Sequence, residues 1–181
     1  MSRQQHNPKL RFYKLAVAQS DIGSALAGFR QIVELKLDSS ESLFRTLIFG
    51  AIVSYAKPFV GNKMYGKLSK HWEEFPNTSL SRAHFELIEL RHKIVAHNDW
   101  EDVQVVLIPP GSKLTVEGHP PIEVDEMCFA VKIPGVHESR IEDFIALCEH
   151  QDLALLEELG ATKDILFQPD DLPRGPFTLE F

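Results

Sequence analysis

The 181-residue sequence has few cysteines and no long apolar run, and both shortages exclude classes of protein. Cys128 and Cys148 are too few and too far apart for a disulfide-stapled fold or a CxxC pair, so we expect two small apolar side chains in a reducing compartment. No apolar run approaches the roughly 18 residues that a membrane span needs. The N-terminal segment is polar and basic, unlike a signal peptide. We therefore expect a soluble cytoplasmic protein that does not contact a membrane.

Several motifs of common enzymes are also missing. The sequence contains no Walker A loop, no GxGxxG after a predicted strand, no GxSxG elbow and no HExxH pair. Five histidines show no local ligand cluster with Cys or Asp; these are His71, His84, His119, His137 and His150. The sequence thus predicts no metal site and no cofactor.

Charge is distributed unevenly along the chain, whose formal net charge is −7. Residues 1–97 contain 14 Lys and Arg against 8 Asp and Glu, whereas residues 98–181 contain 5 against 18. Residues 42–72 include five basic side chains and no acidic one. This distribution allows a polyanionic partner for the first half; two oppositely charged surfaces that only keep the protein soluble are the alternative.

The first half has the apolar period of helices. Apolar residues recur every three, four and seven residues from 12 to about 37, which predicts an amphipathic helix. Asp38 and Glu41 have the spacing of a capping box for a second helix, which Pro58 is expected to end. A third helix is expected from Thr78 or Ser79 to about residues 98–99, after a loop at 60–77 in which 67–74 allows a short helix.

In the second half the period changes from helix to strand. Residues 103–108 and 127–133 predict strands, with a possible short strand at 114–116 between them. A fourth helix is expected over 138–159, with Gly160 as its end. The sequence thus predicts a mainly α fold: an antiparallel helical bundle over residues 1–100, then a small β-meander, a closing helix and an acidic proline-rich tail over 101–181, packed as one compact domain.

The third predicted helix ends in LRHKIVAHNDW, and this segment carries the candidate chemistry. Arg91 has no acidic residue three or four positions away, so its guanidinium needs a tertiary partner or an anion. His97 follows six residues later, in the last turn, where the helix dipole favours the imidazolium form. A permanent cation beside a histidine that titrates near neutral pH suits phosphodiester chemistry.

This segment resembles the ribonuclease motif of the HEPN family of helical-bundle proteins: an arginine, a polar residue, a short spacer and a histidine, here Arg91, His92 and His97. Residues 10–100 also resemble the abortive-infection and toxin branch of that family, with YAKPF closing one helix and Asn98 just beyond the motif. The β-meander, closing helix and tail lie outside the resemblance.

The resemblance implies a metal-independent endoribonuclease in bacterial defence or a toxin–antitoxin pair. His97 would act as general base or acid on a ribose 2′-hydroxyl, Arg91 would hold the scissile phosphate, and His92 would orient the substrate. It also implies a homodimer, with the two motifs facing each other, and a possible antitoxin or regulatory partner. On an ideal helix Arg91 and His97 point about 120° apart, so one chain aligns them imperfectly.

Candidate RNA-binding residues are Asn98 and four lysines interleaved with aromatic residues, namely Lys57, Lys63, Lys67 and Lys70. A solvated loop with aromatic anchors in the core explains the same lysines. Arg91 equally suits an ion pair with a carboxylate of the acidic half, His92 a solvated position, and His97 a helix cap. The alternative function is therefore a non-catalytic HEPN-like module that binds a partner protein or a nucleotide.

The acidic second half suggests one further hypothesis. It would cover the basic surface of residues 42–72 and hold the site inactive until displaced. Truncation near residue 136 is then expected to raise RNA binding or cleavage.

Overall fold

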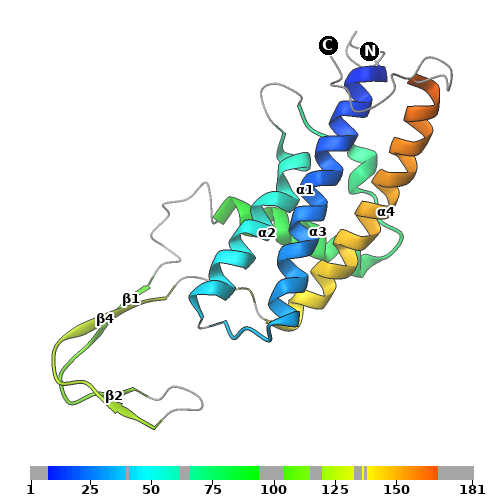
Figure 1. Cartoon of the computed structure of the whole chain (residues 1–181). Helices are drawn as coiled ribbons and strands as arrows, with labels where there is room; N and C mark the ends of the chain where they lie inside the picture. The colour runs from blue at the N-terminus through cyan, green and yellow to red at the C-terminus, as the bar shows by residue number, and fades with distance from the viewer. Residues whose placement is uncertain are drawn as a thin grey trace, which may run out of the picture.

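The structure is a computed structural model that describes residues 8–39, 41–61, 66–93, 104–114, 120–132, 136 and 138–166. These residues form a mainly α fold, as predicted (Figure 1). Its long helices are α1 (Pro8–Glu34), α2 (Ser42–Val60), α3 (Thr78–Arg91) and α4 (Ile141–Leu166). Two short 3-10 helices, η2 (Lys70–Glu73) and η4 (Glu138–Arg140), precede α3 and α4.

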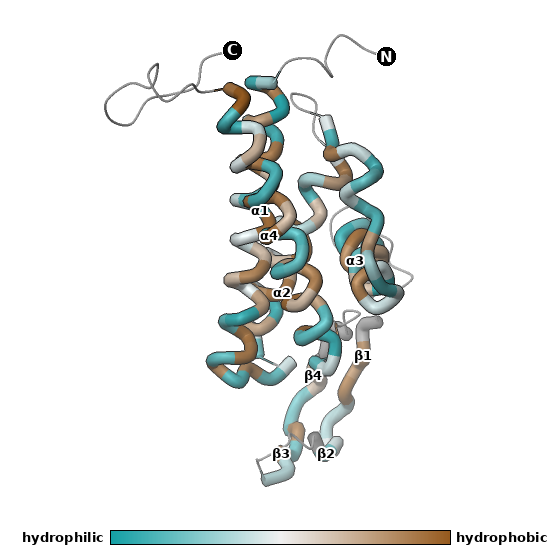
Figure 2. The backbone as a smooth tube through the Cα atoms, turned by 90° about the vertical axis from the view of Figure 1, so that its right-hand side faces the viewer, coloured by the Kyte–Doolittle hydropathy of each residue, from teal (hydrophilic) through white to brown (hydrophobic). Residues whose placement is uncertain are grey.

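Helices α1, α2 and α4 form the bundle, and α3 lies across them (Figure 1). Helix α1 runs opposite to α2 and α4, and its extensive packing is against these two helices (Figure 1). The apolar stripes that the helical period predicts meet in one core, where Phe29 of α1 contacts Phe144 of α4 at a ring-centroid distance of 5.5 Å. Figure 2 shows hydrophobic residues recurring along each of these helices between hydrophilic ones.

Helix α4 is an integral part of this bundle. Its buried residues, Ile141, Phe144, Leu147, Cys148 and Leu155 among them, belong to the same core as those of α1 and α2. The bundle is therefore built from both sides of the expected boundary at residue 100. A displaceable acidic cover is not compatible with this packing, because removing α4 would expose the core.

Four helix ends differ from the sequence prediction. Helix α2 begins at Ser42 with Glu41 as its N-cap, not with the predicted cap Asp38. Asn77, rather than Thr78 or Ser79, caps α3, and its side chain accepts a hydrogen bond from the Leu80 amide at 2.9 Å. Pro58 lies inside α2, which continues to Val60 and ends at Gly61, where φ is +80° and glycine is favoured. Gly160 lies inside α4, on a side where an added Cβ would meet no atom within 4 Å.

The predicted meander is instead one long hairpin. Strand β1 (Gln104–Ile108) pairs antiparallel with β4 (Cys128–Lys132), and β2 (Lys113–Leu114) pairs with β3 (Ile122–Glu123). The register continues without a shift from Ile108↔Cys128 to Lys113↔Glu123, so both pairs belong to one ribbon. The interruption contains Pro109 and Pro110, which lack the amide that a ladder needs. Figures 1 and 2 show this ribbon projecting away from the helices.

Contrary to the expectation from the sequence, one helix of the described residues, α2, has the length and composition of a membrane-spanning helix. In the structure it is a core helix, and Ile48, Ile52 and Tyr55 are buried against the rest of the bundle.

Candidate functional site

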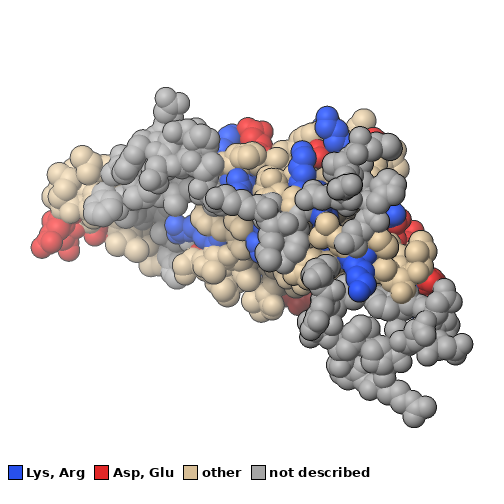
Figure 3. All heavy atoms as spheres, turned by 90° about the horizontal axis from the view of Figure 1, so that it is seen from above, with Lys and Arg blue, Asp and Glu red and all other residues tan. Residues whose placement is uncertain are grey.

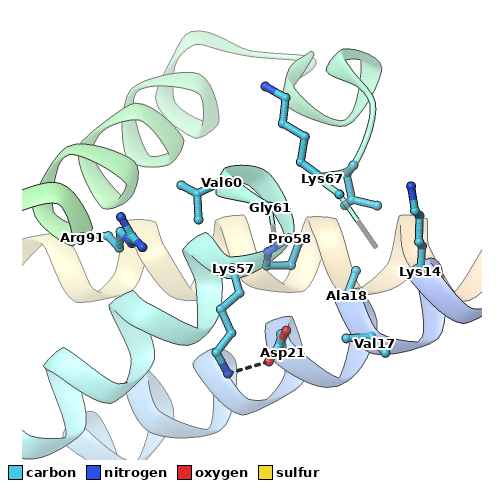
Figure 4. A pocket seen from close by; sticks show the side chains of 12 residues that line it. Lys14, Val17, Ala18, Asp21, Lys57, Pro58, Val60, Gly61, Lys67 and Arg91 are labelled. Carbon is cyan, nitrogen blue, oxygen red and sulfur yellow. Dashed lines mark hydrogen bonds and ion pairs between the residues drawn. The ribbon is translucent and has the colours of Figure 1, made fainter. Parts of the chain in front are cut away.

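A basic cleft lies where α1 passes the C-terminal ends of α2 and α3 (Figure 4). Its volume is about 290 Å³. Small and apolar residues line it together with four basic side chains and one carboxylate. These charged residues are Lys14, Asp21, Lys57, Lys67 and Arg91. In Figure 4, Arg91 lies at one end of the cleft and Lys14 at the other. Among the predicted site residues, the structure thus brings Arg91, Lys57 and Lys67 together.

Backbone contacts at the end of α2 place Lys67 over the cleft. The Leu68 amide donates a hydrogen bond to the Pro58 carbonyl at 2.8 Å, and the Leu68 side chain is buried in the core. A Cβ on Gly61 would lie 3.1 Å from the Lys67 amide nitrogen. Glycine at this position therefore permits both the left-handed turn and the close approach of the segment that carries Lys67.

Lys57 extends from the last turn of α2 towards α1. Its ammonium lies 3.0 Å from Oδ1 of Asp21, the pair marked by the dashed line in Figure 4. The Lys57 side chain is 56% exposed, so it also faces solvent in the cleft. Lys57 and Arg91 both occupy last helical turns, where the helix dipole favours a cation.

Arg91 is half-buried and lines the cleft. No carboxylate of the described residues lies within ion-pair distance of its guanidinium. The tie between α3 and the second half of the chain is made by another arginine: Arg140 pairs with Glu86 of α3 at 2.6 Å, and with Asp143. The structural alternative for Arg91, an ion pair to the acidic half, therefore finds no partner in the described part of the chain.

The other predicted residues lie elsewhere or outside the described residues. His92 is exposed at the C-terminal cap of α3 and Lys70 is exposed at the start of η2; neither lines this cleft. Lys63, His97 and Asn98 lie outside the described residues.

Sequence reasoning missed Lys14 and Asp21. Both lie on α1, seven residues apart, and so on the same helix face. On a long amphipathic helix a charged residue is normally interpreted as part of the solvent-exposed face. Its neighbours in the sequence do not show that it faces the end of another helix. Figure 3, which views the molecule from above, shows Lys and Arg side chains over the helices, with Asp and Glu side chains among them and also at the far end of the ribbon.

A buried polar cluster joins α2, α3 and η2 beside the core. The Tyr55 hydroxyl is 2.8 Å from Nδ1 of His84, and Glu73 of η2 lies 3.9 Å from Nε2. Because the carboxylate favours the Nε2–H tautomer, Tyr55 donates and Nδ1 accepts. Burial lowers the pKa of His84, opposed by the nearby Glu73 carboxylate. Burial also raises the pKa of Tyr55. This cluster fixes η2 against the bundle.

The described residues contain no group of three or more His, Cys, Asp or Glu side chains placed to hold a metal ion. The cleft can bind an anion through four cations. Lys57 is paired with Asp21, whereas Arg91 is half-buried and has no carboxylate partner among the described residues. Comparison with protein-family models, with curated proteins and with solved structures finds no match for this chain.

Proposed function

We propose that this protein is a HEPN-like, metal-independent endoribonuclease, and that the phosphates of its RNA substrate bind in the basic cleft. One observation carries the proposal: Arg91, half-buried and without a described carboxylate partner, shares a cleft with Lys14, Lys57 and Lys67. A bound anion would stabilise a guanidinium in such a position. The phosphate groups of RNA are anions that both arginine and lysine side chains bind.

The proposed reaction cleaves RNA by attack of a ribose 2′-oxygen on the adjacent phosphorus. His97, six residues after Arg91, takes the 2′-hydroxyl proton, the bond from phosphorus to the 5′-oxygen breaks, and that oxygen leaves as a hydroxyl after receiving a proton. The products are a 2′,3′-cyclic phosphate and a 5′-hydroxyl end. Arg91 binds the non-bridging oxygens and stabilises the charge that develops on them.

The lysines have a different role in this proposal. Lys14, Lys57 and Lys67 hold neighbouring phosphates and so set the path of the strand, with Asp21 fixing the Lys57 ammonium. Because Arg91 and His97 point about 120° apart on an ideal helix, a homodimer that brings two motifs together is part of the proposal. A role in bacterial defence or as a toxin, in the cytoplasm and with an antitoxin or regulatory partner, follows from the family resemblance.

The test is cleavage of a labelled RNA panel in EDTA. We expect wild-type protein to produce 2′,3′-cyclic phosphate ends, and His97→Ala and Arg91→Ala to lose this activity by at least about a hundredfold. Arg82→Ala is the matched control, because Arg82 is an exposed arginine of the same helix outside the cleft. Lys67→Ala should weaken RNA binding more than Lys70→Ala, whose side chain lies off the cleft.

Binding without cleavage by folded, dimeric protein would overturn the nuclease and favour the non-catalytic module. In that case Arg91→Ala and Lys67→Ala would still weaken binding. Equal binding by wild type, Arg91→Ala and Lys67→Ala would remove the cleft itself as a nucleic-acid site.

A further inference from the structure

A second cleft continues directly from the basic cleft. Its volume is about 380 Å³, and the two share Lys14, Lys67 and Leu68. Beyond these shared residues the second cleft is lined by Arg11, Ser69, His71, Trp72 and Glu158. Lys14 and Lys67 therefore stand between the two clefts, and a strand bound by both lysines reaches from Arg91 to the aromatic rings of η2.

The rings of His71 and Trp72 form a pre-arranged pair. Their centroids are 5.0 Å apart, and both residues line the second cleft. Nε2 of Gln151, a side chain that is 2% exposed, donates to the Trp72 carbonyl at 2.8 Å. The Ser69 hydroxyl lies 2.8 Å from Nδ1 of His71. These bonds, with the packing of Trp72 against the core, hold the rings in place before any ligand arrives.

The charge of the surface changes beyond the ring pair. A third cleft shares His71, Trp72 and Glu158 with the second, and its other lining residues include Glu74, Glu157 and His150. Arg11 does not extend the basic path, because it is paired with Glu158. Carboxylates repel phosphates, so a polyanion that follows the lysines ends its favourable path at His71 and Trp72.

We propose that His71 and Trp72 form a base-stacking subsite, and that the substrate of the cleft is single-stranded RNA. Phosphates run past Arg91, Lys57 and the Lys14–Lys67 pair, and one unpaired base stacks on the rings of η2. A duplex offers no free base face at this point, so it gains the electrostatic contacts alone. This inference rests on the proposed function of the basic cleft and adds its substrate class.

The test uses a 2′-O-methylated oligonucleotide of about eight nucleotides, which the proposed reaction cannot cleave because its 2′-oxygen is blocked. Binding is measured by fluorescence anisotropy for the intact strand, for strands with one abasic position moved along the sequence, and for the duplex. We expect one abasic position to weaken binding about tenfold, and the duplex to bind more weakly than the single strand.

Substitution separates stacking from charge. His71→Ala should weaken binding of the intact strand about tenfold and leave binding of the most affected abasic strand unchanged. His150→Ala is the matched control, because His150 lines only the acidic third cleft. Trp72→Phe keeps an aromatic ring and the packing, so it should retain most of the binding. In Trp100→Phe protein, Trp72 is the one remaining tryptophan, and the strand should quench its emission.

The outcomes also separate this inference from the proposed function. Suppose that Arg91→Ala and Lys67→Ala weaken binding of the intact strand. If His71→Ala does not, and if wild-type protein binds every abasic strand with the affinity of the intact strand, then the stacking subsite is wrong and the basic cleft remains supported. Equal affinity for duplex and single strand would likewise overturn it. If no oligonucleotide binds, both proposals fail.

Discussion

The helical bundle and the β-ribbon place their apolar side chains in opposite environments. In the bundle, Phe29 and Phe144 are fully buried and contact each other. In the ribbon, Leu107 is 68% exposed and Met127 is 63% exposed. An amphipathic helix buries its stripe against other helices, whereas a two-stranded ribbon without a second layer has nothing of its own to cover it. Isolated two-stranded hairpins are at best marginally stable, so the bundle supplies the free energy of folding.

The candidate site lies in the helical part of the molecule and not in the ribbon. Every residue that lines the basic cleft comes from α1, α2, α3 or the segment between α2 and α3. The ribbon contributes no lining residue among those described. Changes in the ribbon are therefore expected to leave the cleft intact, and changes in the bundle core are expected to destroy both the fold and the site.

The largest effect should follow removal of α4. Truncation after residue 136 deletes a helix that supplies several fully buried side chains, so we expect loss of the cooperative fold rather than increased RNA binding. Circular dichroism during thermal unfolding, together with size-exclusion chromatography, measures this. A truncated chain that keeps a sharp thermal transition would show that the core does not depend on α4.

A single core substitution should have the next largest effect. Phe144→Ala removes a fully buried ring that packs on Phe29, and we expect the free energy of unfolding to fall by roughly 3–5 kcal/mol. Urea denaturation monitored by helical signal gives the value. A loss below about 1 kcal/mol would mean that the core is less tightly packed than the structure indicates.

The ion pair between α3 and η4, the short helix that leads into α4, should contribute less. Arg140→Ala removes three hydrogen bonds to Glu86 and the bond to Asp143, so we expect destabilisation of roughly 1–2 kcal/mol. The control is Arg30→Ala, which breaks an exposed pair with Glu149 on the same bundle and should change stability little. Equal losses in the two variants would contradict the ranking.

The pH dependence of stability should report His84. Burial lowers the pKa of His84 in the folded protein. As the pH falls below about 6.5, His84 is therefore protonated in the unfolded chain before it is protonated in the folded protein. The stability that the neutral ring contributes is therefore present above that pH and is lost as the pH falls towards the lowered folded value. His84→Asn should flatten this part of the curve in urea titrations across that range; an unchanged slope would exclude His84 as its source.

The smallest effect is expected in the ribbon. Leu107→Ala shortens a largely exposed side chain, so the unfolding free energy of the bundle should change by less than about 0.5 kcal/mol. Amide hydrogen exchange should also be faster in β1 and β4 than in α1 and α4. A loss comparable with that of Phe144→Ala would mean that the ribbon is packed against something in solution.

The helices could be predicted because their signal is local. The spacing of Leu15, Ile22, Leu26 and Phe29 is enough to predict α1 and its buried face, and the structure confirms this. Helix ends were harder, because Gly160 stops a helix only where the chain must turn, and there α4 continues along α1. The register of the ribbon could not be predicted, because β2 pairs with β3, a strand of two residues in which only Ile122 is apolar.

The candidate site could be predicted only in part. Arg91 was conspicuous because its helical neighbours are apolar, and Lys57 and Lys67 because no acid lies near them in sequence. Their grouping depends on the crossing of α1 with two helix ends, which no spacing encodes. The same crossing brings in Lys14, and it leaves out Lys70, three residues from Lys67, because η2 turns the chain away.

Because α1 packs against α4, the core is complete only after the last helix has been synthesised. Helix α1 leaves the ribosome well before α4. Its apolar face therefore stays incompletely buried until the residues of α4 that cover it, which include Phe144 and Leu155, have been synthesised. The walls of the basic cleft are translated early, yet the Trp72 carbonyl gains its hydrogen bond only when Gln151 has been made. A nascent chain that stops before α4 therefore carries the cationic residues without the finished groove.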